Sequence, residues 1–382
     1  MLKGVGVTFD DVVKYLPDME EELASMHIPE GLGMKVQELL LRAVIQEDVD
    51  IYVRTKVNHV LLEEGRAVGV EITDADGCDL LVGAKAVVVA TGGYAFNPDM
   101  VARFNVLGGD THVWTTLPDE LGVNNTGDGI TMVEEIGGLV NGGVLQLFAG
   151  GMGKIVGSES GAAGTQPTLW VDQHGKRFIN EDVAKRGTYA GTCLAALGGS
   201  YGYGILDQSI IDHLRTVGSE ISFGAFLPYH QPMSHVMVEM KEDMEQGTVF
   251  MADTIEDLAD QIGVDKDQFL RTVDAYNAMC AAGKDEEFYK DPQFLDALVT
   301  GPFYAFKIAP DFPTSCGGIV VNEKLQVIGA DHKPIKGLYA AGNDASGLYG
   351  DTYTMTIPGS TNGFAHTSGM VAGRVIAEAL SH

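Results

Sequence analysis

The sequence predicts an α/β protein, and three features support this. Residues 34–46 place apolar side chains at the spacing of an amphipathic helix. Residues 86–90 are continuously apolar, as in a strand buried on both faces. A glycine-rich stretch, residues 337–369, joins an apolar strand to a helix-like tail. Glycine loses more conformational freedom on folding than other residues, so such a cluster indicates that backbone closely approaches a ligand.

Length and composition narrow the possibilities. A chain of 382 residues is long enough for two or three structural units. Acidic residues number 53 and basic residues 25, so the net charge is −28. This charge argues against nucleic-acid partners and anionic membranes, although local arginines would still allow an anionic small substrate. No apolar run approaches the ~18 residues of a membrane span, and no cysteine pattern predicts a metal site.

The first third of the chain is expected to change from helix to strands. Residues 10–47 are interpreted as helical. Val57 and Val60 lead into a turn at Glu64 and Gly65, after which residues 68–72 alternate as in a half-buried strand. Asp76-Gly77 predicts another hairpin turn.

The remaining elements follow from turn residues and periodicity. A helix is expected after residues 125–129, with Asp128 as a possible cap. Residues 254–283 predict two helices separated at Gly263. Other expected elements are a strand, a turn and an exit strand at 169–182, two short strands at 317–328, a buried strand at 336–342 and a terminal helix at 360–380.

Five segments occur in one order along the chain: "VVVATGGYAFNPDMV", "NTGDGITMVEEIGG", "VDQHGKRFINED", "GGIVVN…QVIGADHKPIKGLYAAGN" and "GSTNGFAHTSGMVAGRVIA". Together they resemble the FAD-dependent fumarate reductase/succinate dehydrogenase flavoprotein superfamily, over roughly residues 30 to 382. Soluble reductases of unsaturated acids and the 3-ketosteroid dehydrogenases are the members most similar to it.

The resemblance implies a division into two domains. A three-layer FAD-binding domain of the glutathione reductase type would occupy residues 1–144 and 313–382. An inserted α+β capping domain would occupy residues 145–312, with substrate between the two. The GxGxxG fingerprint of such domains is not found, since "KGVGVTFDDV" has phenylalanine at the third glycine position. The chain therefore resembles a member without its N-terminal Rossmann unit: a truncated form, one completed by another chain, or a degenerate homologue.

The resemblance also assigns residues to the cofactor, FAD. The segment under the flavin ring would be Gly359, Ser360, Thr361, Asn362 and Gly363, whose helix N-terminus favours negative charge on reduced flavin. Thr91, Gly92 and Gly93 would lie near the adenine side. Gly342, Asn343 and Asp344 match the segment that binds a ribityl hydroxyl, with either Asn343 or Asp344 as its partner. Asp128 would be a flavin-domain contact or only a helix cap.

Three residues are candidates for catalysis. In related reductases a cap arginine after the "RFxNE" motif delivers a proton while flavin N5 delivers hydride. Arg186 follows "RFINED" here, one position beyond Lys185 at the matching offset, and Tyr189 is a second possible donor. A helix starting near Asp182 would place Arg186 and Tyr189 on one face. Tyr353 aligns approximately with a substrate-binding arginine of the C-terminal loop.

The function implied is that of a flavin-dependent oxidoreductase acting on CH–CH groups, which reduces a C=C bond conjugated to a carbonyl or carboxylate. The alternatives are a 3-ketosteroid-type dehydrogenase, or a truncated homologue without flavin or activity. Because cations are few in the site segments, a less charged, larger or aromatic substrate is expected rather than fumarate. Expected partners are a small-molecule substrate and either an electron-donor protein or the missing N-terminal chain; the compartment stays open between cytoplasm and export.

Overall fold

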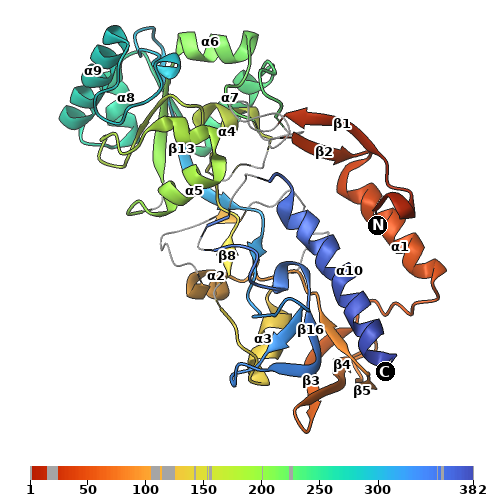
Figure 1. Cartoon of the computed structure of the whole chain (residues 1–382). Helices are drawn as coiled ribbons and strands as arrows, with labels where there is room; N and C mark the ends of the chain where they lie inside the picture. The colour runs from red at the N-terminus through yellow and green to blue at the C-terminus, as the bar shows by residue number, and fades with distance from the viewer. Residues whose placement is uncertain are drawn as a thin grey trace.

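The computed structural model describes residues 2–14, 25–104, 112–113, 125–141, 143–152, 154, 157–199, 201–222, 227–350, 352–353 and 357–381. Figure 1 shows two sheet-and-helix layers, one above the other, with an N-terminal hairpin and two long helices beside them. The predicted α/β class is confirmed. Within these residues, no helix has both the length and the apolar character needed to cross a bilayer.

The lower layer is built on a six-stranded sheet. Its strands are β3 (Lys56–Glu63), β4 (Arg66–Thr73), β5 (Asp79–Gly83), β6 (Val87–Val89), β15 (Gln326–Ile328) and β16 (Pro334–Ala340). β3, β4 and β5 are joined by hairpins at the two predicted turns. Glu64 and Gly65 both have left-handed backbone angles, φ 49° and 74°, as a tight two-residue hairpin requires. The two hairpins are thus confirmed.

β6 is more exposed than the sequence predicted. It pairs in parallel with β16, and helix α3 (Asp128–Glu135) covers one of its faces. A Cβ on Gly129 would lie 2.3 Å from the Val89 side chain, so α3 approaches β6 too closely for any residue larger than glycine at this position. The opposite face is open, because Val88 is 42% exposed. The prediction that this strand is buried on both faces is wrong for the described part of the chain.

The upper layer surrounds a second six-stranded sheet. Its strands are β7 (His112–Val113), β9 (Phe148–Gly151), β10 (Leu169–Val171), β11 (Gly202–Asp207), β12 (Val249–Ala252) and β13 (Phe303–Phe312). β13 is the central strand: its first half pairs with β11 and β12, and its second half pairs with β9. One hydrophobic core joins β10–β13 to the helices around them.

Helices enclose the upper sheet on its flanks (Figure 1). They are α4 (Glu159–Gly164), α5 (Gly187–Ala195), α6 (Gln208–Thr216), α7 (Val236–Gln246), α8 (Ile255–Ile262) and α9 (Lys266–Ala282). Gly263 ends α8 in a left-handed conformation, φ 71°, so the predicted break between two helices is confirmed. In the lower layer, α2 (Pro98–Phe104) was not predicted, while the terminal helix α10 (Ser360–Leu380) was.

The N-terminal prediction needs correction. Helix α1 (Leu32–Gln46) starts only after left-handed Gly31, whereas β1 (Phe9–Lys14) and β2 (Ser25–Pro29) form an antiparallel hairpin; 15–24 lie outside the described residues. The helical periodicity belongs to α1 alone, and the preceding segments satisfy their backbone groups by pairing. A 3₁₀ turn, η1 (Leu2–Val5), precedes the hairpin.

Two further expectations were partly wrong. After β10, Arg177 forms a single bridge to Val171 in place of an exit strand, and the 3₁₀ helix η3 (Glu181–Lys185) follows. Within 317–328 only β15 is a strand. Short elements complete the fold: β8 (Val144–Leu145), β14 (Ser315–Cys316), η4 (Pro292–Phe294) and η5 (Gly342–Asp344).

A buried ionic cluster explains why the backbone leaves the sheet at Arg177. The Arg177 guanidinium donates to Glu181 at 2.7 and 2.8 Å and to Asp285 at 2.7 Å, and all three side chains are buried. The buried Lys290 ammonium lies 3.5 Å from Glu181. Since a buried charge left without its partner is strongly destabilising, this cluster fixes η3 and the segment that follows it.

Asp285 carries an acid-sensitive part of this stability. Burial disfavours its charge, but the Arg177 hydrogen bond and the amides of Lys290, Phe288 and Glu287 outweigh burial and hold the pKa of the carboxyl well below its usual range. A carboxyl whose folded-state pKa is lowered stabilises the folded state above its unfolded pKa, and that contribution is lost as the pH falls.

We therefore expect Asp285→Asn to lower the free energy of unfolding at pH 7 by about 3–5 kcal/mol, because one buried partner of Arg177 is removed. The gap between variant and parent should stay constant between pH 7 and 5 and narrow below about pH 4. Urea unfolding across this range measures both quantities. Asp274→Asn, at an exposed position of α9, is the control; a gap independent of pH would contradict the proposed role of Asp285.

Candidate active site

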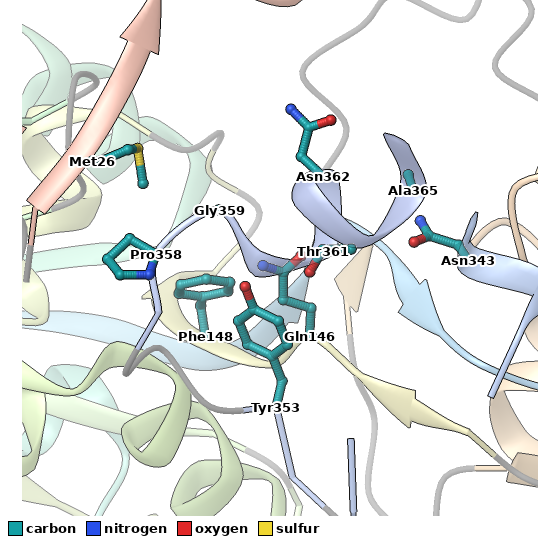
Figure 2. A pocket seen from close by; sticks show the side chains of 10 residues that line it. All are labelled: Met26, Gln146, Phe148, Asn343, Tyr353, Pro358, Gly359, Thr361, Asn362 and Ala365. Atoms are coloured by element: carbon teal, nitrogen blue, oxygen red, sulfur yellow. The ribbon is translucent and has the colours of Figure 1, made fainter. Parts of the chain in front are cut away.

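A cavity of about 390 Å³ lies at the first turn of α10, between the N-terminal hairpin and the upper sheet (Figure 2). Side chains from the hairpin, from β9 and the segment before it, from η5 and from α10 converge on it. They are Met26, Gln146, Phe148, Asn343, Tyr353, Pro358, Gly359, Thr361, Asn362 and Ala365. The lining therefore joins segments that are far apart in the sequence.

The start of α10 supplies polar backbone to this cavity. Gly359 is the N-cap, with φ 74° and no capping side chain. The first hydrogen bond within the helix runs from the Gly363 amide to the Gly359 carbonyl at 2.8 Å. The amides of Thr361 and Asn362 lie before it and therefore have no carbonyl partner within the helix. Amides at a helix N-terminus and the helix dipole both favour negative charge on a bound group.

The glycines of this turn are next to open space. A Cβ added at Gly359 or at Gly363 would meet no heavy atom within 4 Å. At Gly359 the left-handed backbone, φ 74°, itself favours glycine. The open space at both positions leaves room for a ligand to approach the backbone closely.

Asp344 joins the other two segments predicted to contact FAD, Thr91–Gly93 and Gly342–Asp344. Its buried carboxylate accepts hydrogen bonds from the amides of Gly92 at 3.1 Å and Gly93 at 3.0 Å, and from the amide and hydroxyl of Thr91. Burial nevertheless raises the pKa of Asp344, against the effect of these donors. Since the carboxylate is occupied by the turn after β6, its observed role is to join that turn to η5.

Asn343 faces the cavity, as the sequence allowed. Its Nδ2 donates to Thr314 Oγ1 at 2.8 Å, and its side chain is part of the cavity lining. Gly342, with φ 64°, donates its amide to Ser368 Oγ at 2.9 Å and so fixes η5 to α10. Asn343 is thus the better placed of the two predicted polar partners.

Asp128 does not cap α3. Gly127 is the N-cap, without a side-chain capping bond, and Asp128 is the first helical residue. Its carboxylate accepts from Thr126 Oγ1 at 2.9 Å and still benefits from the helix dipole. The capping prediction is wrong because left-handed Gly127 already begins the helix.

Tyr353 is the catalytic candidate that lies in the cavity. Its ring is 6.5 Å from Phe148 and 4.9 Å from Tyr349, measured between centroids. In Figure 2 its hydroxyl points towards the start of α10, where Ser360 Oγ donates to it at 3.3 Å. Close by, burial raises the pKa of the Cys316 thiol to about 12, so this cysteine stays protonated.

Arg186 and Tyr189 are not among the lining residues. Arg186 is the N-cap of α5, between η3 and that helix, and Tyr189 is 42% exposed. The expected single helix from Asp182 is wrong, since η3 ends at Lys185. α5 packs directly behind the cavity wall: a Cβ at Gly191 would lie 2.5 Å from the Phe148 backbone.

Several lining residues were missed from the sequence. Gln146 and Phe148 fall in a glycine-rich stretch that gave no strand signal, and Met26 was assigned to a helix. Pro358 and Ala365 flank the predicted flavin segment and could have been found from it. No group of three or more His, Cys, Asp or Glu in the described parts of the chain could hold a metal ion.

The model of the FAD binding domain family matches residues 12–356. The chain belongs to this family. It is a flavin-dependent oxidoreductase of the fumarate reductase/succinate dehydrogenase flavoprotein superfamily, and FAD is its cofactor.

Two curated relatives illustrate the similarity. A vinyl phenol reductase of Lactiplantibacillus plantarum is 32% identical over 394 residues, covering 99% of this chain and 77% of the relative. An NADH:acrylate oxidoreductase of Vibrio harveyi is 28% identical over 365 residues, covering 91% of this chain but 33% of the relative. The chain therefore spans only part of the length of these relatives.

Solved structures show the same fold. The open conformation of a flavocytochrome c3 fumarate reductase has a TM-score of 0.66 at 24% identity, over 98% of this chain and 61% of that one. The 3-ketosteroid delta1-dehydrogenase from Sterolibacterium denitrificans has a TM-score of 0.69 at 21% identity, over 93% and 64%.

The residues at the cavity fit part of FAD. An uncapped helix N-terminus, glycines facing open space and the amide side chains of Gln146 and Asn343 suit a flat, electron-accepting ring with carbonyl edges. Gly359, Thr361, Asn362 and Asn343 are the residues that would hold it.

We expect Gly359→Val to weaken FAD binding at least tenfold, because a branched side chain would fill the space beside the helix start. Gly247→Val is a matched control: Gly247 also has a left-handed backbone, φ 72°, with nothing within 4 Å of its Cβ position, but lies in the upper layer. The ratio of flavin to protein absorbance measures the effect. Equal FAD content in the two variants would overturn this assignment.

Proposed function

We propose that this oxidoreductase reduces a carbon–carbon double bond conjugated to a neutral, preferably aromatic, group. One observation carries the proposal: within the described residues, the cavity lining has no Asp, Glu, Lys, Arg or His. Phe148 and Tyr353 provide aromatic surface, while the amide side chains of Gln146 and Asn343 belong to the part of the lining that would hold the flavin ring. A carboxylate substrate needs fixed cations, whereas an apolar ring gains from this lining.

The names of the relatives support the same reaction class. One relative acts on vinyl phenol and another on acrylate. Between these two, the lining favours the neutral vinyl phenol type. The 3-ketosteroid-type dehydrogenase reaction is the reverse chemistry, and among the described lining residues no contact favours it over reduction.

The chain's own residues have distinct roles in this proposal. Bound FAD, once reduced, supplies the hydride. Thr361 and Asn362 amides stabilise negative charge at the start of α10, and Phe148 packs against the substrate ring. Tyr353 holds the proton that the substrate carbon receives, because its buried hydroxyl faces the cavity.

A protein electron donor is part of the proposal. The net charge of −28 favours a donor with a basic docking face.

A second polypeptide that completes the flavin domain is the other expected partner. It is supported by uncovered apolar side chains on and after α1, among them Met34 at 88% and Tyr52 at 76% exposure, and by the exposed Val88 of β6.

Reoxidation of the dithionite-reduced, FAD-loaded protein tests the reaction class. We expect 4-vinylphenol to restore the absorbance of oxidised flavin at least ~10²-fold faster than fumarate, because a dicarboxylate would be left without cationic partners. The reverse reaction, dehydrogenation, is tested by incubating the protein with a saturated ketosteroid and an electron-accepting dye and measuring dye reduction. Equal rates with fumarate would contradict the neutral substrate, and dye reduction alone would favour the dehydrogenase.

The proton donor is tested separately. We expect Tyr353→Phe to slow 4-vinylphenol reduction by ~10²–10⁴-fold, the usual contribution of a general acid, with flavin content unchanged. Arg186→Ala and Tyr189→Phe test the two other candidate proton donors in the same assay. If either of them, and not Tyr353→Phe, produces this loss, the donor belongs to the η3–α5 junction.

A further inference from the structure

Three hydroxyl groups form a continuous chain beneath the first turn of α10. Tyr349 OH and Ser360 Oγ lie 2.8 Å apart, and Ser360 Oγ donates to Tyr353 OH at 3.3 Å. The two tyrosine rings lie against each other, with centroids 4.9 Å apart and planes inclined by 53°. Each hydroxyl can both donate and accept, so a proton can pass along such a chain.

Burial changes along this chain from one end to the other. Tyr353 is 3% exposed and lines the cavity, whereas Ser360 and Tyr349 are half-buried. Tyr349 is the more exposed of the two tyrosines, so the chain leads from a partly exposed residue to the cavity.

Tyr353 needs such a connection if it donates a proton. Each donation removes the hydroxyl proton of Tyr353, and the next turnover needs a new proton on that oxygen. Burial raises the pKa of the Tyr349 phenol, against the effect of the Ser360 hydrogen bond, so this phenol is protonated between turnovers. The proton must therefore be replaced from solvent within each turnover.

We propose that Ser360 and Tyr349 form a proton relay that restores the Tyr353 hydroxyl, a role that rests on the proposed function. The Tyr353 O–H bond breaks as the substrate C–H bond forms. Tyr353 oxygen takes the Ser360 proton, Ser360 takes the Tyr349 proton, and Tyr349 takes one from water. In sum, one solvent proton and the hydride supplied by reduced FAD add across the double bond.

A side branch of the network does not provide this route. Thr361 Oγ1 lies 3.4 Å from Tyr349 OH, and Cys316 Sγ lies 3.9 Å from that Thr361 oxygen. The Cys316 thiol is buried, so this branch leads into the protein and not towards solvent. Ser360 is thus the link between the two tyrosines, and it acts as a positioning residue for Tyr353.

The test compares Ser360→Ala, Ser360→Thr and Tyr349→Phe with the parent in the 4-vinylphenol assay, in H₂O and in D₂O. Ser360→Ala and Tyr349→Phe should each lower kcat more than about tenfold, but less than the ~10²–10⁴-fold of Tyr353→Phe. Their solvent isotope effect should rise, while KM and flavin content stay at parental values. Ser360→Thr keeps a hydroxyl and should restore kcat and the isotope effect. Thr367→Ala, on an exposed part of the same helix, is the control.

A second readout does not depend on turnover. NMR of protein labelled with ¹³C at tyrosine Cζ reports each phenol, with Tyr349 and Tyr353 assigned from their Phe variants. Ser360→Ala should shift both resonances and raise the pKa of Tyr349, while Thr367→Ala shifts neither. The proposed function fails if the parent reduces no test alkene. The relay is overturned if Ser360→Ala keeps parental kcat and isotope effect, or if neither tyrosine resonance responds.

Discussion

The carboxylate of Asp344 is the contact on which the site depends. It gathers the amides of the Thr91–Gly93 turn, so the end of β6 and the end of β16 are fixed to each other. Without that acceptor, buried amides would lose their partner, at a cost of about 1–3 kcal/mol for each group. Gly93 is held so closely that a Cβ there would lie 2.4 Å from Ser315 Oγ. The position of η5, and with it Asn343, follows from this contact.

The same contact orients α10. Gly342 precedes Asp344 by two residues and donates to Ser368 in the helix, so the turn that Asp344 fixes also sets the direction of α10. The helix start then lies at the cavity, with its glycine cap open to a ligand. One short hydrogen-bonded unit thereby places the end of β6, the 3₁₀ turn η5 and the start of α10. The aromatic groups Phe148 and Tyr353 complete the cavity from other parts of the chain.

The sequence predicted what local rules decide. Gly263, the Glu64–Gly65 turn and the segment after Gly359 were recognised because each breaks a periodic pattern at a defined backbone conformation. The sequence did not predict Phe148 in the cavity, because its position depends on the long-range pairing of β9 with β13. Gln146 is placed by a similarly distant contact, its backbone amide bonding to the Thr314 carbonyl, whereas Met26 was missed because its hairpin was interpreted as helix. Asp344 was named as a ligand partner, but its burial against the Thr91–Gly93 amides could only be seen in three dimensions. A single helix over Arg186 and Tyr189 was also expected, but η3 ends at Lys185 and α5 begins at Gly187, with Arg186 between them.

β13 makes the cavity wall and the upper sheet parts of one mechanical unit. Phe303 to Ile308 are bonded to β11, and Ile308 to Asp311 are bonded to β9, which carries Phe148. A displacement of the upper sheet therefore also moves the Phe148 ring, because hydrogen bonds hold β9 to β13. The start of α10 is fixed to the lower layer through η5. A displacement of β13 would therefore change the distance between the Phe148 ring and the start of α10, and with it the width of the cavity.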